Sequence, residues 1–325
     1  MSEWPISFQD VIEARRRLRP YLPPTPVRQY PTLDAEVGGG ISVLVKHENH
    51  NPTNAFKARN GLSLMSSLSA EERARGVVAP TRGNHGLGLA NAGRLLGVPV
   101  TICVPVGNNP EKNEAMRALG ATVIEEGADF DEAVEVAERL VKEKGLRMGH
   151  SVNEPMVVAG AGTITLEILE QVTALDAMAI AVGGGSQAVG AMTVLRTLKP
   201  EVKVYGVQAE GAPTIHDSWH AGKPVTGRGA DTFADGVATR NAYELTFPAL
   251  QKGLAGFVKV SDAEIAEAIR ILLRTTHNLV EPAGAVGFAG LMKLREELAG
   301  KTVAVIISGG NIDTPTLRRV LNGEI

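Results

Sequence analysis

Short apolar runs alternate with helical patterns along most of this chain, and that alternation limits the folds open to it. Runs 42–46, 98–104 and 302–307 have the length and the β-branched content of buried strands. Longer segments with helical patterns, among them 130–144, 163–172 and 262–276, separate the runs. The pattern predicts an α/β fold with mainly parallel sheets covered by helices on both faces. Residues 211–240 lack both patterns, and we expect a loop there.

Two glycine-rich turns predict that the chain forms two lobes. Residues 81–88 and 183–190 each lead from an apolar run into a helical segment. Ligands of open α/β sheets bind at the carboxyl ends of strands, so we expect a site between the lobes. We expect residues 77–153 to form a small substrate-binding domain, inserted into a large cofactor-binding domain of residues 1–76 and 154–325.

Composition narrows the classes of partner. The chain has 325 residues, is 44% hydrophobic and carries a formal net charge of −3, which argues against nucleic acid or an anionic membrane surface. No apolar run approaches the roughly 20 residues of a membrane helix, and the first residues lack a signal-peptide pattern. We therefore expect a cytoplasmic protein. Its single cysteine, Cys103, lies in an apolar run and is expected to be a buried thiol. No histidine or cysteine spacing predicts a metal site.

Taken one at a time, the motifs of this chain differ in how specifically they predict a function, and residues 183–186 form the most specific one. Three glycines and a serine follow an apolar strand and precede a helix, so their amide groups are expected to cradle an anion such as a phosphate. A tight turn is the simpler alternative. The same glycines fit a dinucleotide-binding pattern loosely, which keeps a nicotinamide oxidoreductase open, although the following strand ends at Gln208 rather than an acid.

Three further segments gain meaning only together. Lys57, beside Phe56, is a candidate aldehyde-reactive amine if its surroundings favour the neutral form, whereas a solvated surface charge is the ordinary alternative. The amides and hydroxyl of residues 81–86 suit a substrate carboxylate or a helix cap. Ser308 leaves the last strand before two glycines and is expected to meet a ligand ring atom or to form a turn.

In this order the segments resemble the serine/threonine dehydratase and serine racemase family of fold-type II pyridoxal-phosphate enzymes. The resemblance extends from about Phe8 to Val320. The family's Ser-Phe-Lys-x-Arg-Gly, Ser-x-Gly-Asn-His-Gly and tetraglycine motifs, with three further echoes, correspond here to residues 55–60, 81–86, 183–186, 234–237, 281–284 and 308–311. The resemblance implies a tryptophan synthase β-like architecture.

The resemblance also implies roles for individual residues. Lys57 would carry pyridoxal 5'-phosphate as a Schiff base and remove the substrate α-proton. Phe56 would pack beside the cofactor ring, Asn84 would bond the ring's 3' oxygen, and Ser308 would face the pyridine nitrogen. The remaining cofactor-binding residues would be Gly183, Gly184, Gly185, Ser186 and Gly236. The substrate-binding residues would be Thr81, Arg82, Gly83, Asn84 and His85.

The implied reaction is elimination of water from a 3-hydroxy amino acid such as threonine, serine or 3-hydroxyaspartate, giving a 2-oxo acid and ammonia. Racemases have a serine where this chain has Arg82, and arginine is a poor proton shuttle, which favours elimination over racemisation. Arg82 would bind the α-carboxylate, bind a second carboxylate, or face solvent. β-Replacement, racemisation and a non-catalytic binding protein remain alternatives.

The family's divalent-cation site is not expected here, because Gln208 and Thr214 stand where acidic ligands would be, although Glu210 is close. We expect a homo-oligomer, either a dimer or a tetramer.

Overall fold

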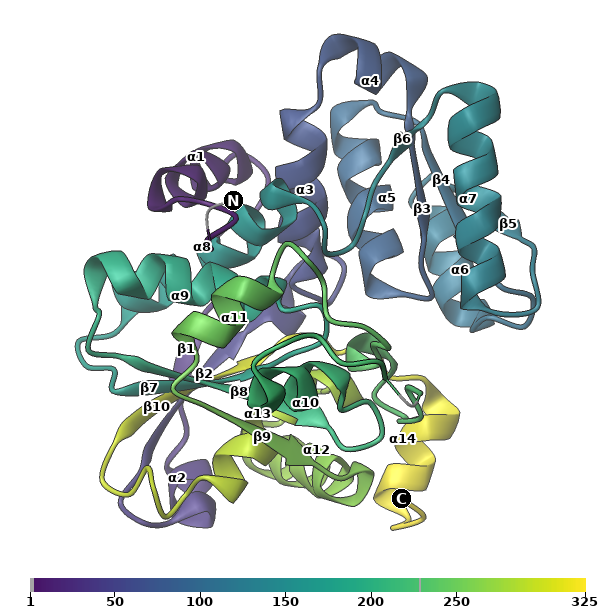
Figure 1. The fold of residues 1–325 in the computed structure, drawn as a ribbon. Coiled ribbons are helices and arrows are strands. Elements are labelled where there is room, and N and C mark those ends of the chain that lie inside the picture. Colours follow the sequence, from purple (N-terminus) through teal and green to yellow (C-terminus); the bar gives the residue numbers. More distant parts are fainter. Residues whose placement is uncertain (1–2, 228) are drawn as a thin grey trace.

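The computed structural model describes residues 3–227 and 229–325. In this part of the chain, two separate sheets are each covered by helices (Figure 1). The predicted α/β fold with mainly parallel sheets is confirmed.

The larger sheet has six strands. They are β1 (Val27–Gln29), β2 (Ser42–His47), β7 (Ala177–Ala181), β8 (Lys203–Ala209), β9 (Gly256–Val260) and β10 (Thr302–Ile307). Their order is β1-β2-β10-β7-β8-β9, and all neighbours are parallel except β1 and β2. The central strands are buried on both faces, as their unbroken runs of valine, alanine and isoleucine require.

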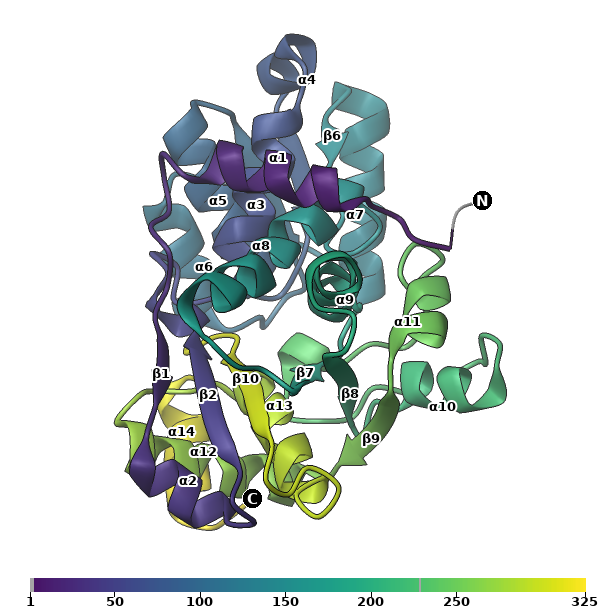
Figure 2. The same cartoon turned by 90° about the vertical axis from the view of Figure 1, so that its left-hand side faces the viewer.

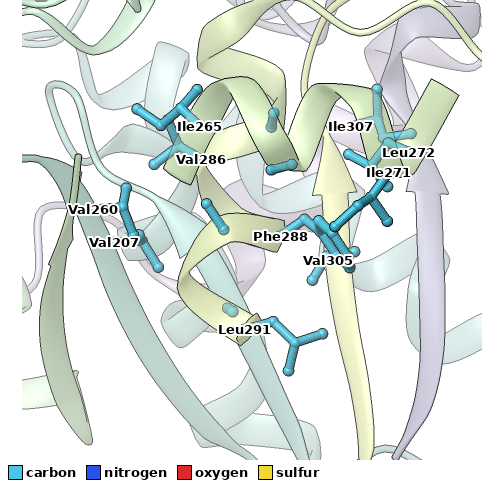
Figure 3. Packing of buried hydrophobic residues seen from close by; sticks show 14 of the residues in the cluster. Val207, Val260, Ile265, Ile271, Leu272, Val286, Phe288, Leu291, Val305 and Ile307 are labelled. Carbon is cyan, nitrogen blue, oxygen red and sulfur yellow. The ribbon is translucent and has the colours of Figure 1, made fainter. Parts of the chain in front are cut away.

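Helices pack on both faces of the larger sheet (Figures 1 and 2). On one face lie α2 (Pro31–Val37), α12 (Asp262–Thr276), α13 (Pro282–Lys293) and α14 (Thr314–Leu321). On the other lie α9 (Ser186–Leu198), α11 (Phe247–Gly253) and α8 (Pro155–Gln171), with α1 (Phe8–Leu18) packed on α8. Figure 3 shows the first of these cores, where Val286, Phe288 and Leu291 of α13 meet Val305 and Val207 of the sheet. Burial of such side chains is the main favourable term in folding.

The smaller sheet has four parallel strands in the order β5-β4-β3-β6. They are β3 (Val77–Pro80), β4 (Val100–Val104), β5 (Thr122–Glu125) and β6 (Arg147–Met148). One face packs on α7 (Phe130–Lys144), and the other on α5 (Asn84–Leu96) and α6 (Pro110–Ala118).

Helix α3 (Lys57–Ser67) joins the two sheets. A Cβ atom on Gly61 would lie 2.3 Å from the Gly88 carbonyl oxygen, and one on Gly88 would lie 2.2 Å from the Lys57 carbonyl oxygen. Only glycines permit helices α3 and α5 to approach this closely. Side chains of α3, including Leu62, share a hydrophobic core with the smaller sheet. The division into a domain of residues 77–153 and a domain of the remaining residues stays a prediction.

Several expected elements have the predicted bounds, and others differ. Residues 130–144, 262–276 and 302–307 form α7, α12 and β10 as expected. The expected loop at 211–240 is wrong in part, because α10 (Thr214–Ala221) and the 3-10 turn η2 (Asp235–Val237) lie within it. The short elements η1 (Glu48–His50) and α4 (Ala70–Arg75) complete the fold.

Cys103 is fully buried in β4, as predicted, and burial raises the pKa of its thiol to about 11. Among the helices described, none is both long and apolar enough to cross a membrane.

Candidate active site

Four segments meet where strands of the two sheets end. The segment before Lys57 follows β2, Thr81 follows β3, Gly183 follows β7, and Ser308 follows β10. The carboxyl ends of parallel strands are the usual ligand-binding edge of an α/β sheet. The four predicted motifs are thus distributed over the edge that the fold favours for a site.

Backbone hydrogen bonds fix the Lys57 segment against the end of β10. Phe56 N donates to Ser308 O at 2.9 Å, and Gly310 N donates to Asn54 O at 2.9 Å. The Asn311 side-chain amide donates to Thr53 O at 2.9 Å. The structure therefore brings the predicted residues Phe56, Lys57 and Ser308 together.

Lys57 is the first residue of α3, and its amine stands apart from other charges. Within the described chain, Nζ has no hydrogen bond or ion pair and lies 5.0 Å from the centre of the Phe56 ring. The side chain keeps limited contact with solvent, yet burial lowers its pKa to about 8. An amine with this pKa is partly neutral near neutral pH, which a nucleophile or a proton acceptor requires.

Asn84 is held by two side chains from segments next to the larger sheet, Glu281 before α13 and Asn311 after β10. Its Nδ2 donates to Glu281 Oε1 at 2.6 Å, and its Oδ1 accepts from Asn311 Nδ2 at 2.7 Å. Burial and the negative charge of Asp235 raise the pKa of Glu281 to about 7. Sequence reasoning noted residues 281–284 as an echo of the family but gave Glu281 no role, because no local pattern shows that its partner is Asn84.

The turn before α5 places backbone groups at the cleft. Thr81 is buried and its Oγ1 accepts from Gly83 N at 3.3 Å, while Arg82 is exposed. A cavity of about 280 Å³ beside Arg82 is also lined by Lys112 and Asp235. Lys112 Nζ donates to Asp235 at 2.8 Å, and its side chain packs over Gly83. Although burial opposes it, Asp235 raises the pKa of Lys112, so this cation stays charged at the cavity.

The His85 ring contacts the protein backbone at Gly149. Its Nε2 lies 2.9 Å from Gly149 O, and a carbonyl oxygen only accepts, so Nε2 carries the proton. Burial and the positive charge of Lys57 lower the pKa of His85 to about 3. The remaining ring nitrogen, Nδ1, is buried without a partner among the described residues. A contact from His85 to a substrate carboxylate would therefore come from its backbone amide, and the substrate-binding role of His85 stays a prediction.

His150 is a site residue that sequence reasoning missed. Its Nδ1 accepts from the backbone amides of Val152 and Asn153, both at 2.9 Å, so a neutral ring carries its proton on Nε2. Burial lowers its pKa, and the charge of Lys57 lowers it further. His150 is thus a neutral ring whose pKa responds to the charge of Lys57. The sequence around it contains no motif that would have indicated this.

The glycine loop of residues 183–186 fits closely against its neighbours. A Cβ on Gly184 would lie 2.0 Å from Val152 Cγ2, and Gly185 has a φ of +88°, so both positions require glycine. Ser186 begins α9, whose start has no side-chain cap. Gly183 packs on the backbone of Gly236, which brings the predicted Gly236 beside the loop.

Two residues after Lys57 on α3, Arg59 belongs to a buried ionic cluster in which every charge has a partner of opposite charge. We define it as Lys46, Glu48, Arg59 and Glu167, whose side chains are at most 2% exposed. Arg59 donates to both carboxylates, at 2.7–2.9 Å, and Lys46 Nζ donates to Glu167 at 2.7 Å. Two cations and two anions balance, which is how buried charges are tolerated.

The described residues contain no group of three or more histidine, cysteine or acidic side chains arranged to hold a metal ion. Gln208 accepts from His216 N at 2.8 Å, and Glu210 lies 3.8 Å from Lys293. The expectation that no metal binds here stays a prediction.

Comparisons with known proteins define the class. The family model described as "Pyridoxal-phosphate dependent enzyme" matches residues 18–309. An L-threonine ammonia-lyase of Thermotoga maritima is 40% identical over 98% of this chain and 78% of its own length. An L-threo-3-hydroxyaspartate ammonia-lyase of a Pseudomonas species is 35% identical over 98% of this chain and 99% of its own. A maize serine racemase structure superposes with a TM-score of 0.92 at 28% identity, covering 99% of this chain and 98% of its own.

The chain belongs to the pyridoxal-phosphate dependent enzyme family, as the sequence resemblance predicted. Pyridoxal phosphate is its cofactor.

The residues present fit that cofactor on structural grounds. Lys57 is an amine without a partner in the described chain, with a pKa near 8, as an aldehyde requires. The uncapped start of α9 offers free amides to a phosphate. Gln187 Nε2, in the first turn of that helix, is buried without a partner among the described residues, and it would gain one there.

Proposed function

We propose that this enzyme eliminates water from a small 3-hydroxy amino acid. The observation that carries the proposal is the isolated, partly neutral amine of Lys57 at the strand ends, in a chain whose relatives are named ammonia-lyases. The α-proton and the β-hydroxyl leave as water, and hydrolysis of the resulting enamine releases ammonia and a 2-oxo acid.

The predicted cofactor residues fit one placement. We infer that residues 183–186 bind the phosphate, that Phe56 flanks the ring, that Asn84 faces the ring's 3' oxygen and that Ser308 faces the pyridine nitrogen. Gly236 supports the phosphate loop from behind. Lys57 would hold the cofactor in the resting enzyme, and the cofactor would supply an electron sink for the α-carbon of a bound amino acid, which would acidify the α-proton.

The chain's own residues then bind, orient and exchange protons. The Lys57 amine takes the α-proton, and a pKa near 8 suits a group that must both accept and return a proton near neutral pH. The hydroxyl of Thr81, which the Gly83 amide holds in place, and the backbone amides of Asn84 and His85 orient the substrate carboxylate. Because Arg82 is exposed and permanently charged, it does not serve as a second proton carrier, which favours elimination over racemisation.

The decisive experiment follows product and colour together. The purified protein is expected to absorb near roughly 410–420 nm, where pyridoxal compounds bound to lysine absorb. It should also release 2-oxo acid from at least one of L-threonine, L-serine and the two 3-hydroxyaspartate diastereomers. Lys57→Ala should lose both the colour and the turnover, and a coloured, active variant would refute the assignment. Sulfide-dependent product would indicate β-replacement instead, and appearance of the D-amino acid would indicate racemisation.

A dicarboxylic substrate is a second candidate, because one cation at the substrate turn has no carboxylate partner. Arg82 and Lys112 line the cavity together with Asp235 and Asp313. Asp235 pairs with Lys112, whereas Arg82 is exposed and forms no ion pair among the described residues, so a second carboxylate beside the turn would meet Arg82. Arg82→Ala should then lower kcat/KM for 3-hydroxyaspartate by at least about tenfold, the effect of losing one charged hydrogen bond, and leave threonine unchanged. Equal effects on both substrates would refute this specificity.

We also infer a homo-oligomer, a dimer or a tetramer, located in the cytoplasm. Light scattering during gel filtration measures the first, and fractionation of the native host tests the second.

A further inference from the structure

The carboxyl group of Glu281 occupies an unusual place among the buried charges of this protein. The residue is 3% exposed, and no lysine, arginine or histidine of the described chain forms an ion pair with it. It precedes α13 in the N-cap position, yet its side chain does not cap that helix. The carboxyl group instead contacts Asn84 and lies against Gly309, which belong to two of the predicted site motifs.

Two neighbours hold Glu281 in that position. Its Oε1 accepts from Asn84 Nδ2 at 2.6 Å, and its backbone N donates to Gly309 O at 3.1 Å. A Cβ on Gly309 would lie 2.0 Å from the same Oε1, so only glycine leaves room for the carboxyl group. Because Gly309 follows Ser308, Glu281 lies between the two loops that we assign to the 3' oxygen and the pyridine nitrogen of the cofactor ring.

The contacts of Asn84 show what this position achieves. Asn84 Oδ1 accepts from Asn311, and one Nδ2 hydrogen is donated to Glu281. An amide held at both ends cannot flip, so its second Nδ2 hydrogen has one fixed direction. Glu281 thereby sets which donor Asn84 presents to a ligand.

We propose that Glu281 is a positioning residue, a carboxyl group buried without a cationic ion-pair partner in the described chain that orients Asn84 toward the cofactor. The proposal rests on the cofactor placement given above, and it adds a residue whose protonation state that placement did not include.

The charges around Glu281 decide how it titrates. Asp235 of η2 opposes its ionisation, whereas Lys112 of α6 and the hydrogen bonds from Asn84 and from the Asn311 backbone favour it. Lys112 is itself neutralised by Asp235 at 2.8 Å. Burial outweighs the favourable contacts and brings the pKa to about 7, against 4.5 for an ordinary glutamate.

Because the pKa of Glu281 is higher in the folded protein than in the unfolded chain, the stability of the protein depends on pH. Between pH 4.5 and 7 the folded protein holds a proton on Glu281 that the unfolded chain releases, so this group's contribution to stability declines as the pH rises. Glu281→Gln removes the titration without changing the shape of the side chain. We compare the unfolding midpoints of the two cofactor-free proteins at each pH. As the pH rises from about 4.5 to 7, the difference between the variant and the wild type should shift by about 2–4 °C in favour of the variant.

The matched control is Glu111→Gln, an exposed glutamate on α6, which should follow the wild type at every pH. If the difference in unfolding midpoint between Glu281→Gln and the wild type does not change with pH, Glu281 does not titrate in this range. Infrared difference spectra of the wild type itself, recorded across the same pH range, give an independent reading. Loss of a protonated carboxyl band on raising the pH supports the proposal, and its absence contradicts it.

The orienting role has its own readout in cofactor affinity. Glu281→Asp keeps the charge but withdraws it from Asn84, and should weaken cofactor binding about tenfold, the value of one charged hydrogen bond. In an Asn84→Ala background the same change should have no further effect. An equal loss in both backgrounds would show a general structural role and overturn the positioning. Neither the unfolding nor the affinity measurement needs turnover, so failure of the proposed reaction would leave both results interpretable.

Discussion

The first turn of α3 carries two cations with opposite surroundings, the partly buried Lys57 and the fully buried Arg59. Arg59 donates to two carboxylates and belongs to the ionic cluster, in which every charge has a partner. Lys57, two residues earlier, has no charged partner among the described residues, and its pKa falls to about 8. The same helix therefore has one side that is electrostatically satisfied and one that is not.

The contrast separates what holds this protein together from what makes it reactive. A buried pair that is fully hydrogen-bonded fixes geometry, and its members resist changes of protonation. An isolated buried amine or carboxyl group costs folding free energy and titrates near neutral pH. The ionic cluster ties β2, η1, α3 and α8 together directly behind Lys57. We infer that this rigidity holds the reactive amine in place.

Removing Lys57 gives the largest expected effect on activity and the opposite effect on stability. Lys57→Met should abolish turnover, because the amine both attaches the cofactor and moves the α-proton. In the cofactor-free protein, the unfolded chain binds more protons than the folded one between pH 8 and 10.5, so the full cost of burying the charged amine is present below that range. The variant should therefore be more stable at neutral pH by about 1–3 kcal/mol. Urea titrations of both cofactor-free proteins measure this, and a loss of stability would break the comparison.

Breaking the ionic cluster should have the reverse outcome. Arg59→Met leaves two carboxylates buried without their main partner and should lower the free energy of unfolding by about 3–5 kcal/mol. The surface pair of Arg274 with Glu36, at 2.8 Å, is the matched control, and Arg274→Met should cost at most about 1 kcal/mol. Chemical denaturation measures both. Similar losses at the two sites would show that burial of the cluster does not matter.

The comparison also explains which parts of the site the sequence could reveal. Lys57, Asn84, the glycine loop and Ser308 each lie in a short motif, because backbone geometry requires particular residues at adjacent positions. The partners of Arg59 are 11 and 108 residues distant, and those of Asn84 are 197 and 227 residues distant. Pairing of that kind depends on how sheets and helices pack, and one sequence does not contain it.

The fold was predictable to a similar limit. Amphipathic α7 and α12 have the expected bounds, because a periodic apolar face marks their whole length. Helix α8 begins at Pro155, eight residues before the expected start, since residues 157–168 are buried all round and show no polar face. The short strand β9 and the helix α10 were not predicted, because tertiary contacts define them more than local pattern does.

Replacing Glu48 of the ionic cluster by glutamine removes a charge but keeps the shape of the side chain, and its effect on the free energy of unfolding should be smaller than that of Arg59→Met. Although burial alone would raise it, Arg59 holds the pKa of Glu48 below its ordinary value of 4.5. A carboxylate of this kind contributes stability above its unfolded pKa, and that contribution is lost as the pH falls. Glu48→Gln should cost about 1–3 kcal/mol at neutral pH and show a shallower loss of stability below pH 4.5. The pH dependence of urea unfolding checks this. A slope like that of Glu281, with stability declining as the pH rises, would contradict the assignment of Glu48 to the compensated class.

Cys103 gives the smallest expected effect, because it is buried but uncharged. Burial raises its pKa to about 11, so the thiol stays neutral near neutral pH and needs no partner. Cys103→Ala removes one atom from the core between β4 and α7 and should cost about 1 kcal/mol, with turnover unchanged. The native wild-type thiol should react with a disulfide reagent only as fast as the protein unfolds, whereas urea should expose it fully. Rapid labelling of the folded protein would show that this core opens locally. It would also mean that burial of Cys103 is not enough to make its thiol unreactive, so burial would not explain why Cys103 is inert and Lys57 is reactive.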